Sequence, residues 1–296
     1  MIYSNDNQTL AADSSGWGWQ SSCTTPIAVE RKYCIFAGDL VRSRLEPRLM
    51  TSKTVVWLRT RLFSNQLNDW QFYHQRIAAE LAHLDSHAGR TATVLDIGCG
   101  RGLIAPFPWE RYPFVNRTGL DPDESARQNT TLQEFRLLEI GKAWPVASGS
   151  VDLAVARYVL EHLGDSKAFF DELNRVLKPD GRFVFLTPNK LHPSMLVASL
   201  LSHSLKTRLL GARGVDSDDV FPAFYLVNSR AAIEAAAVRG SLTVTQITIR
   251  EFIPVGYLDF LLLGFLVSLG LYCLLRWSRT ERIFGVAIVG MLEKRK

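Results

Sequence analysis

The feature that most constrains this 296-residue chain is a run of apolar residues that ends in three closely spaced glycines. The run Val94-Leu95-Asp96-Ile97 passes directly into Gly98-Cys99-Gly100-Arg101-Gly102. Such a run is typical of a buried strand, and the glycines let the backbone bend tightly and let a ligand approach where a Cβ atom would clash. Ligands of open α/β sheets bind at the carboxyl ends of strands. The pattern therefore predicts a ligand site at this turn, with the Asp96 carboxylate beside it.

Short apolar runs alternate with helical stretches from Thr91 onward. The expected strands are Ala92–Ile97, Arg117–Leu120, Phe135–Ile140, Val151–Ala156, Arg182–Leu186, Ser241–Arg250 and Ile283–Leu292. The expected helices are Asn65–Leu84, Ser166–Leu177 and Asn228–Val238, the last with Asn228 or Ser229 as N-cap and Gly240 beyond its end. This alternation predicts an α/β fold with a parallel sheet that helices cover on both faces.

A second carboxylate follows the glycine turn by about 20 residues, a spacing at which an acid can accept hydrogen bonds from ribose hydroxyls. It belongs to Asp121, at the end of the next strand. A dinucleotide-binding turn more often reads G-x-G-x-x-G and opens a helix. Here the spacing is G-x-G-x-G, and Pro106 and Pro108 interrupt the following helix. The pattern therefore disfavours NAD and FAD.

Four ordered blocks of the sequence, between Thr91 and Asn189, resemble one known family. The blocks are VLDIGCGRG, TGLDPDE, WPVASGSVDLAVARYVLEHL and ELNRVLKPDGRFVFLTPN. They resemble the class I S-adenosylmethionine-dependent methyltransferases of the small-molecule type, with a type 11-like domain. The resemblance implies a Rossmann-like seven-stranded sheet, mostly parallel with an antiparallel last strand and helices on both faces. An apolar helical insertion would precede that last strand.

The resemblance also implies roles for residues at matching positions, with S-adenosylmethionine as cofactor. The implied cofactor-binding residues are Asp96, Gly98, Cys99, Gly100, Asp121, Pro122 and Arg157. Leu120 and Pro122 would border the adenine, and Tyr158 would lie near the substrate entrance. One departure is Ile140, which stands where the family usually has an acid for the adenine amino group, with Glu139 adjacent.

The catalytic candidates are Tyr158 and His162, the latter as a general base directly after the fourth strand. Two other interpretations stay open: His162 holds its loop by hydrogen bonds, and Tyr158 packs rather than touching substrate. Glu161 is expected to be a solvated helix residue.

Composition limits the partners and the domain plan. The net charge is only +5, and the basic residues do not gather into a long stripe, so we expect no nucleic-acid partner. The four cysteines are scattered and favour neither a disulfide framework nor a metal site.

The first residues lack the pattern of a signal peptide, so we expect a cytoplasmic protein. Residues 1–50 are expected to form a mobile tail and residues 51–296 the methyltransferase domain.

The most unusual segment is Tyr257–Trp277, whose core Phe260–Leu275 carries no charge. Because the next strand must return to the sheet, we expect a bent or hairpin-like pair of short helices, broken near Gly264 or Gly270. Residues 195–210 have the pattern of a basic amphipathic helix, which suits a membrane surface. The hypothesis is a membrane-associated monotopic enzyme; a hydrophobic lid, a dimer interface and a transmembrane span are the alternatives.

The expected function is methyl transfer from S-adenosylmethionine to a small-molecule or lipid acceptor that the sequence does not identify. The apolar segments favour a lipophilic acceptor. The alternative is a non-catalytic, cofactor-binding scaffold of the same fold. RNA or protein methylation lacks a recognisable target module in the sequence.

Overall fold

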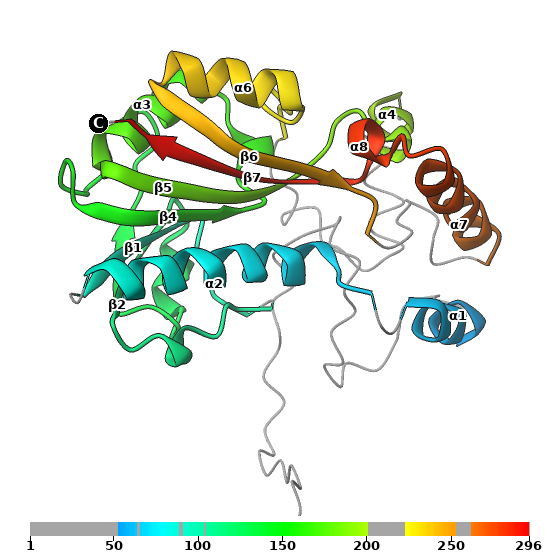
Figure 1. Ribbon diagram of the computed structural model, residues 1–296, viewed down its shortest axis with the longest axis horizontal. Coiled ribbons are helices and arrows are strands. Elements are labelled where there is room, and N and C mark those ends of the chain that lie inside the picture. The colour runs from blue at the N-terminus through cyan, green and yellow to red at the C-terminus, as the bar shows by residue number, and fades with distance from the viewer. Residues whose placement is uncertain are drawn as a thin grey trace, which may run out of the picture. The chain divides into compact units, whose positions relative to one another are not determined.

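The computed structural model describes residues 53–63, 66–88, 91–103, 105–200, 223–252 and 262–295. A seven-stranded sheet with the order β3-β2-β1-β4-β5-β7-β6 forms its centre (Figure 1). Its strands are β1 Ala92–Ile97, β2 Val115–Asp121, β3 Glu134–Leu137, β4 Val151–Arg157, β5 Leu177–Pro188, β6 Leu242–Arg250 and β7 Ala287–Lys294. Strands β1 to β5 pair in parallel, and β7 is antiparallel to both of its neighbours. The expected fold class is confirmed.

Helices cover both faces of the sheet. Helix α2 (Asp69–Ala88) packs on one face through a stripe that includes Ile77 and Leu81. Helices α3 (Ser166–Val176) and α6 (Arg230–Arg239) pack on the other face, as Figure 1 shows. Side chains of a strand alternate between the faces. Val94 of β1 accordingly joins the α2 cluster, and Leu95 joins the α3–α6 cluster.

Several predicted boundaries differ from the observed ones for local reasons. Helix α2 begins at Asp69 because Asn68 and Gln71 form a reciprocal capping pair: Asn68 Oδ1 accepts from Gln71 N at 2.9 Å, and Gln71 Oε1 accepts from Asn68 N at 3.1 Å. The fifth strand, β5, is longer than predicted and starts at Leu177. It includes Asp180, whose backbone adopts a left-handed φ of 62°. Helix α6 agrees with its prediction, with Ser229 as N-cap and Gly240 as C-cap.

The last strand starts later than predicted. The expected strand began at Ile283, but Glu281–Phe284 forms the short helix α8, and β7 begins at Ala287. The third strand is shorter, because β3 ends at Leu137 and Ile140 lies in a turn.

The connection from β1 to β2 has no long helix among its described residues. It carries only the 3-10 turn η1 (Trp109–Arg111), which follows Pro106 and Pro108. This agrees with the expectation that the two prolines interrupt a helix. Two further 3-10 turns, η2 (Glu124–Gln128) and η3 (Leu160–His162), follow β2 and β4.

The predicted break in the apolar insertion is wrong for the described part. Helix α7 runs as one piece from Leu262 to Trp277, through both Gly264 and Gly270. A glycine costs a helix only about 1 kcal/mol relative to alanine. Packing stabilises the helix here, because its Phe265 and Tyr272 are buried against another helix.

That other helix is α1 (Lys53–Phe63), which sequence patterns did not predict. Its Val55 and Phe63 are buried with the α7 residues Phe265 and Tyr272, in a cluster separate from the two clusters of the sheet. The Phe63 and Tyr272 rings meet edge to face, with centroids 5.2 Å apart.

Parts of the predicted apolar segments lie outside the described residues. Of residues 195–210, the structure describes the helix α4 (Pro193–Leu200), and of residues 257–277 it describes α7. The predicted tail of residues 1–50 also lies outside the described residues. Within the described part of the chain, no helix is both long enough and apolar enough to cross a membrane.

Candidate cofactor site

The glycine turn after β1 has a backbone conformation that other residues rarely adopt. Gly98, Gly100 and Gly102 have φ values of 67°, 48° and 69°. A Cβ atom on Gly98 would lie 2.3 Å from Cγ2 of Val159, and one on Gly102 would lie 2.3 Å from Oδ1 of Asn129. Larger side chains would therefore force this turn to shift, so its backbone conformation needs glycine at these positions.

Asp121, at the carboxyl end of β2, holds the same turn. Its Oδ2 accepts from the Gly100 backbone N–H at 2.8 Å, and its Oδ1 accepts from the Asp123 N–H at 2.8 Å. The residue is 4% exposed, and this burial raises the pKa of its carboxyl group. A carboxylate oxygen has two lone pairs, so each Asp121 oxygen retains one acceptor site beyond its backbone bond.

Asn129 fixes the turn from the opposite side, and no sequence motif indicated it. Its Nδ2 donates to the carbonyl oxygens of Cys99 and Gly100, at 3.1 and 3.0 Å. Its Oδ1 accepts from Thr131 N at 3.0 Å, which orients the amide. The position follows η2 as its C-cap, where a contact with β1 becomes visible only in three dimensions.

Cys99 packs inside the turn rather than presenting a reactive thiol. Its Sγ would lie 2.7 Å from a Cβ atom on Gly119 of β2, so it fills the space left by that glycine. Burial, together with the negative charges of Asp96 and Asp121, raises the pKa of the Cys99 thiol. The thiol therefore stays protonated at neutral pH.

Asp96 is the most perturbed carboxylate beside the turn. Burial raises its pKa to about 7; the nearby Arg157 guanidinium opposes this shift and the Asp121 carboxylate adds to it. Arg157 ends β4, next to β1 in the sheet, and its guanidinium donates to the Ala105 carbonyl at 2.8 Å. The structure thus brings Asp96, Asp121, Arg157 and the glycine turn together at one edge of the sheet.

Tyr158 follows directly and adopts a left-handed backbone conformation, with φ at 58°. Its hydroxyl group hydrogen-bonds to Asp69, the first residue of α2. Burial raises the pKa of Asp69. The N-terminal end of α2 therefore reaches the carboxyl end of β4, and Tyr158 is held between them.

His162 lies on η3, and its side chain is exposed. The adjacent Glu161 contradicts its prediction as a solvated residue, because it is only 5% exposed. Its Oε2 accepts from Thr187 Oγ1 at 3.1 Å, and Thr187 Oγ1 accepts from Asn228 Nδ2 at 2.6 Å. Burial raises the pKa of Glu161 to about 8, so this carboxyl group holds a proton at neutral pH.

The two residues expected to border the adenine differ in exposure. Pro122 is exposed at the end of β2. Leu120 is fully buried in the core beneath α3 and α6, so its predicted place beside a ligand is wrong. Side chains of a strand alternate between the two faces of the sheet, and Leu120 lies on the face that α3 and α6 cover.

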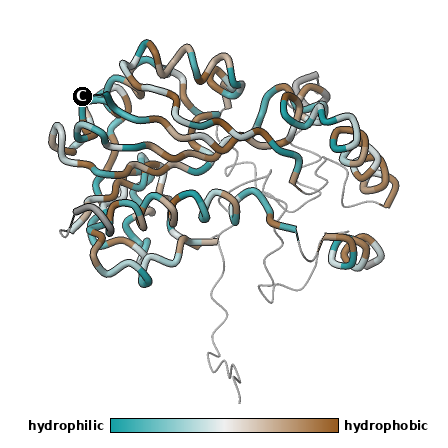
Figure 2. Tube along the Cα trace, viewed as in Figure 1, coloured by the Kyte–Doolittle hydropathy of each residue, from teal (hydrophilic) through white to brown (hydrophobic). Residues whose placement is uncertain are grey.

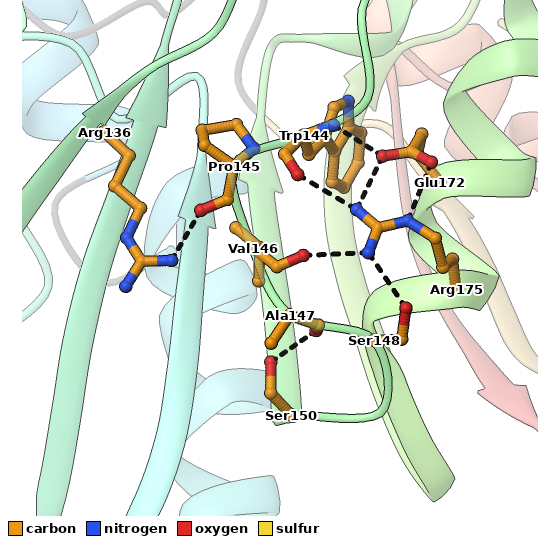
Figure 3. A network of polar contacts seen from close by, with 9 residues as sticks. All are labelled: Arg136, Trp144, Pro145, Val146, Ala147, Ser148, Ser150, Glu172 and Arg175. Carbon is orange, nitrogen blue, oxygen red and sulfur yellow. Dashed lines mark hydrogen bonds and ion pairs between the residues drawn. The ribbon is translucent and has the colours of Figure 1, made fainter.

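Hydrogen bonds to side chains of α3 hold the segment that follows β3 (Figure 3). Arg175 donates to the carbonyl oxygens of Trp144 and Val146 at 3.0 and 2.8 Å, and Glu172 Oε2 accepts from Trp144 N at 2.6 Å. Ile140, in the same segment, is 87% exposed. The adjacent Glu139 forms an ion pair with Lys142. The backbone of residues 144–146 is therefore held by α3, whereas Ile140, a few residues earlier, is exposed.

The family comparison matches residues 70–216 to the model of a methyltransferase domain. A probable S-adenosylmethionine-dependent methyltransferase of Mycolicibacterium smegmatis is 34% identical over 131 residues, 42% of this chain and 47% of the relative. The trans-aconitate 2-methyltransferase of an Azoarcus species is 33% identical over 129 residues, 42% of this chain and 50% of the relative. The chain thus spans about half the length of these curated relatives.

Other similar proteins have comparable names. The ubiquinone biosynthesis O-methyltransferase of Acinetobacter baylyi is 26% identical, over 49% of this chain and 65% of the relative. Among solved structures, a methyltransferase of Methanosarcina mazei has a TM-score of 0.47 and 16% identity, covering 72% of this chain and 97% of its own. Residues 70–216 thus match a methyltransferase domain, and this part of the chain is similar to S-adenosylmethionine-dependent methyltransferases.

Proposed function

We propose that this chain transfers the methyl group of S-adenosylmethionine to a lipophilic small-molecule acceptor. The observation that carries the proposal is the glycine turn, which the buried Asp121 holds through the Gly100 N–H, with the Asp96 carboxylate just before it. The turn leaves a backbone edge without Cβ atoms, which fits a ligand that approaches closely. The two carboxylates match the cationic and hydroxyl groups of the cofactor.

Different residues of the site would bind different parts of the cofactor. Asp96, with Gly98, Cys99 and Gly100, would hold the methionine end, where the Asp96 carboxylate attracts the ammonium group. Asp121 would accept hydrogen bonds from the ribose through its remaining lone pairs. Pro122 is exposed at the end of β2 and would border the adenine. Arg157 would keep Asp96 ionised when the cationic ligand is bound.

When bound, S-adenosylmethionine supplies an activated methyl group, so the acceptor's lone pair bonds to the methyl carbon while the carbon–sulfur pair stays on sulfur. The chain has to align the acceptor, exclude water and receive a proton. His162 is exposed directly after β4 and is the candidate base for that proton. The hydrogen bond to Asp69 fixes the Tyr158 side chain, which would position the acceptor by packing against it.

The choice of a lipophilic acceptor rests on the apolar insertion. In α7 no residue before Arg276 carries a charge, and the chain reaches this helix from the carboxyl end of β6. The names of two relatives, a trans-aconitate and a ubiquinone-biosynthesis methyltransferase, span polar and apolar acceptors. The insertion favours the apolar class for this chain.

A transfer assay tests the proposal. The full-length protein is incubated with methyl-labelled S-adenosylmethionine and a total bacterial lipid and quinone extract, and the organic phase is counted. We expect label in the organic phase, loss of most of it with Asp121→Ala, and at least a tenfold loss with His162→Gln. Matched controls are His83→Gln, on α2, and an incubation without extract.

A second function is favoured by one observation. Ile140 stands exposed where the family has an acid, and Glu139 is paired with Lys142. A cofactor-binding scaffold without transfer would tolerate this loss. If the protein binds S-adenosylhomocysteine but labels no extract component, the scaffold function replaces the enzymatic one.

A further inference from the structure

Helix α7 has an outward stripe that is apolar over its whole length. The apolar side chains of this stripe lie on one side of the helix, with Gly270 among them, and each is more than 40% exposed: Leu263, Leu266, Val267, Leu274 and Trp277. The opposite stripe, which includes Phe265 and Tyr272, is buried. Figure 2 shows the resulting run of apolar residues along α7. A helix on the surface of a water-soluble domain normally turns charged residues outward, so this pattern marks an interaction face.

Helix α1 adds exposed apolar side chains of its own. Val56 and Trp57 are 48% and 63% exposed, while the buried Val55 and Phe63 of the same helix pack with α7. The two helices are also joined through the residues that follow α1, because Tyr272 donates its hydroxyl proton to Gln66 Oε1 at 2.7 Å. We call the outward stripe of α7, on the helix pair that α1 and α7 form, the α1–α7 face.

The charge around the α1–α7 face is positive. Neither helix contains an acidic residue, whereas α1 carries the exposed Arg61 and also Arg59, whose guanidinium lies over the Phe265 ring. Arg276, in the last turn of α7, forms an ion pair with Glu281 at 3.5 Å, and the exposed Arg279 and Arg282 follow. Arginines beside exposed tryptophans and leucines are typical of helices that lie in the interface of an anionic bilayer. A second copy of the chain would bring more arginines to this face and no acid from either helix.

Both helices connect to the edge of the sheet that carries the candidate site. Strand β6 runs parallel to β5, because β7 is antiparallel to both, and Arg250 and Pro188 share Ala287 as their partner. The chain therefore leaves for α7 at the carboxyl edge. Helix α1 precedes α2, whose first residue, Asp69, contacts Tyr158 after β4.

We propose that the α1–α7 face docks the protein on an anionic lipid surface, so that the carboxyl edge of the sheet receives an apolar acceptor from the bilayer. The receipt of an apolar acceptor from the bilayer rests on the proposed function, whereas the docking on a lipid surface does not. Because the outward stripe extends along the whole of α7 and the other side packs on α1, the helix would lie in the plane of the surface.

Vesicle co-sedimentation with the full-length protein tests the docking. Vesicles of phosphatidylcholine with phosphatidylglycerol are compared with vesicles of phosphatidylcholine alone. We expect binding to the anionic vesicles, weakened at least tenfold by the double variant Val267→Ser/Trp277→Ser. The double variant Arg279→Glu/Arg282→Glu should lose the preference for phosphatidylglycerol. The matched control is Val238→Ser, which removes an equally apolar side chain that is 75% exposed on α6 and should leave binding unchanged.

Folding and the cofactor site are checked by titrating each variant with S-adenosylhomocysteine, whose affinity should not change. If the intact protein binds neither vesicle, or if Val267→Ser/Trp277→Ser binds as the intact protein does, the proposal is wrong. A dimer in size-exclusion chromatography that the same variant dissociates would assign the face to a second copy and overturn it as well. Failure of docking with intact S-adenosylhomocysteine binding leaves the proposed function standing, so the two can fail separately.

Discussion

At the scale of single residues, the glycine turn makes a strong prediction about strain. Gly98 and Gly149 both have positive φ, but a Cβ atom meets Val159 only at Gly98, and at Gly149 it meets nothing within 4 Å. Gly149→Ala should lose about 1–2 kcal/mol of unfolding free energy, from the left-handed conformation alone. Gly98→Ala should lose about 1–3 kcal/mol more, because Val159 has to move. Urea unfolding of the two variants measures the difference, and equal losses would rule out the close contact.

The raised pKa of Asp96 predicts pH-dependent cofactor affinity. In the free protein this carboxyl group titrates near pH 7, and a bound ammonium group favours its ionised form. Below pH 7 the ligand must first displace a proton, so affinity for S-adenosylhomocysteine should rise roughly tenfold from pH 6 to pH 8. Asp96→Asn should bind more weakly and with a flat pH profile. Calorimetric titration at several pH values checks this, and a profile that keeps its slope in Asp96→Asn would assign the effect to another group.

Residue-level prediction from the sequence succeeded where a motif carried the information. The glycines and Asp121 stand where the pattern placed them, at the ends of β1 and β2. Asn129 was missed because its contact with the turn spans about thirty residues and follows from the path of the chain after β2. The prediction that Glu161 is solvated is wrong, because η3 places its buried carboxyl group within hydrogen-bond distance of Thr187.

At the scale of elements, the separate α1–α7 cluster predicts a local effect of core truncation. Phe63→Ala removes a ring buried against Tyr272, and such changes cost about 3–5 kcal/mol. Hydrogen exchange should therefore accelerate in α1 and α7, while β1, β4 and β5 keep their protection, since they belong to other clusters. The control is Leu62→Ala on the same helix, where the side chain is already 49% exposed. Equal acceleration throughout the sheet would show that α1 and α7 open only with the whole domain.

Elements with a clear periodicity were predicted well, and short or insertional ones were not. Strands β1 and β4 and helices α3 and α6 lie within a residue or two of their predicted ranges. Helix α1 has few residues and ordinary propensities, and it is stabilised by α7, which lies about 200 positions later in the chain. Packing of this kind decides whether a short helix forms, and it leaves no local pattern.

At the scale of the whole molecule, the buried acids predict how stability depends on pH. The pKa of Glu161 is raised to about 8 in the folded chain from about 4.5 in the unfolded one, so in that range only the unfolded chain ionises and stability falls as pH rises. Asp96, whose pKa is raised to about 7, acts in the same direction. His74, whose pKa burial lowers to about 4, acts in the opposite direction between about 4 and 6.5. The net fall should therefore be clearest from pH 6.5 to pH 8.

Glu161→Gln isolates this contribution, because the amide cannot ionise but can still accept from Thr187. Relative to the intact protein, the variant should gain on average about 1.1 kcal/mol per pH unit between pH 6.5 and 8, because the gain levels off near the folded pKa. Unfolding free energies from denaturant titrations at each pH measure this gain. A difference between the two proteins that stays constant with pH would mean that Glu161 is ionised in the folded state.

The most direct test of the central claim is calorimetric titration of the purified protein with S-adenosylhomocysteine, the product expected of methyl transfer. The predicted result is one site per chain, weakened at least tenfold by Asp121→Ala, which corresponds to about 1.4 kcal/mol. Because Asp121 also holds Gly100, Asn129→Ala serves as the control: it loosens the same turn without removing a carboxylate and should weaken binding less. Absence of binding by the folded, intact protein would contradict the assignment of a cofactor site to this turn.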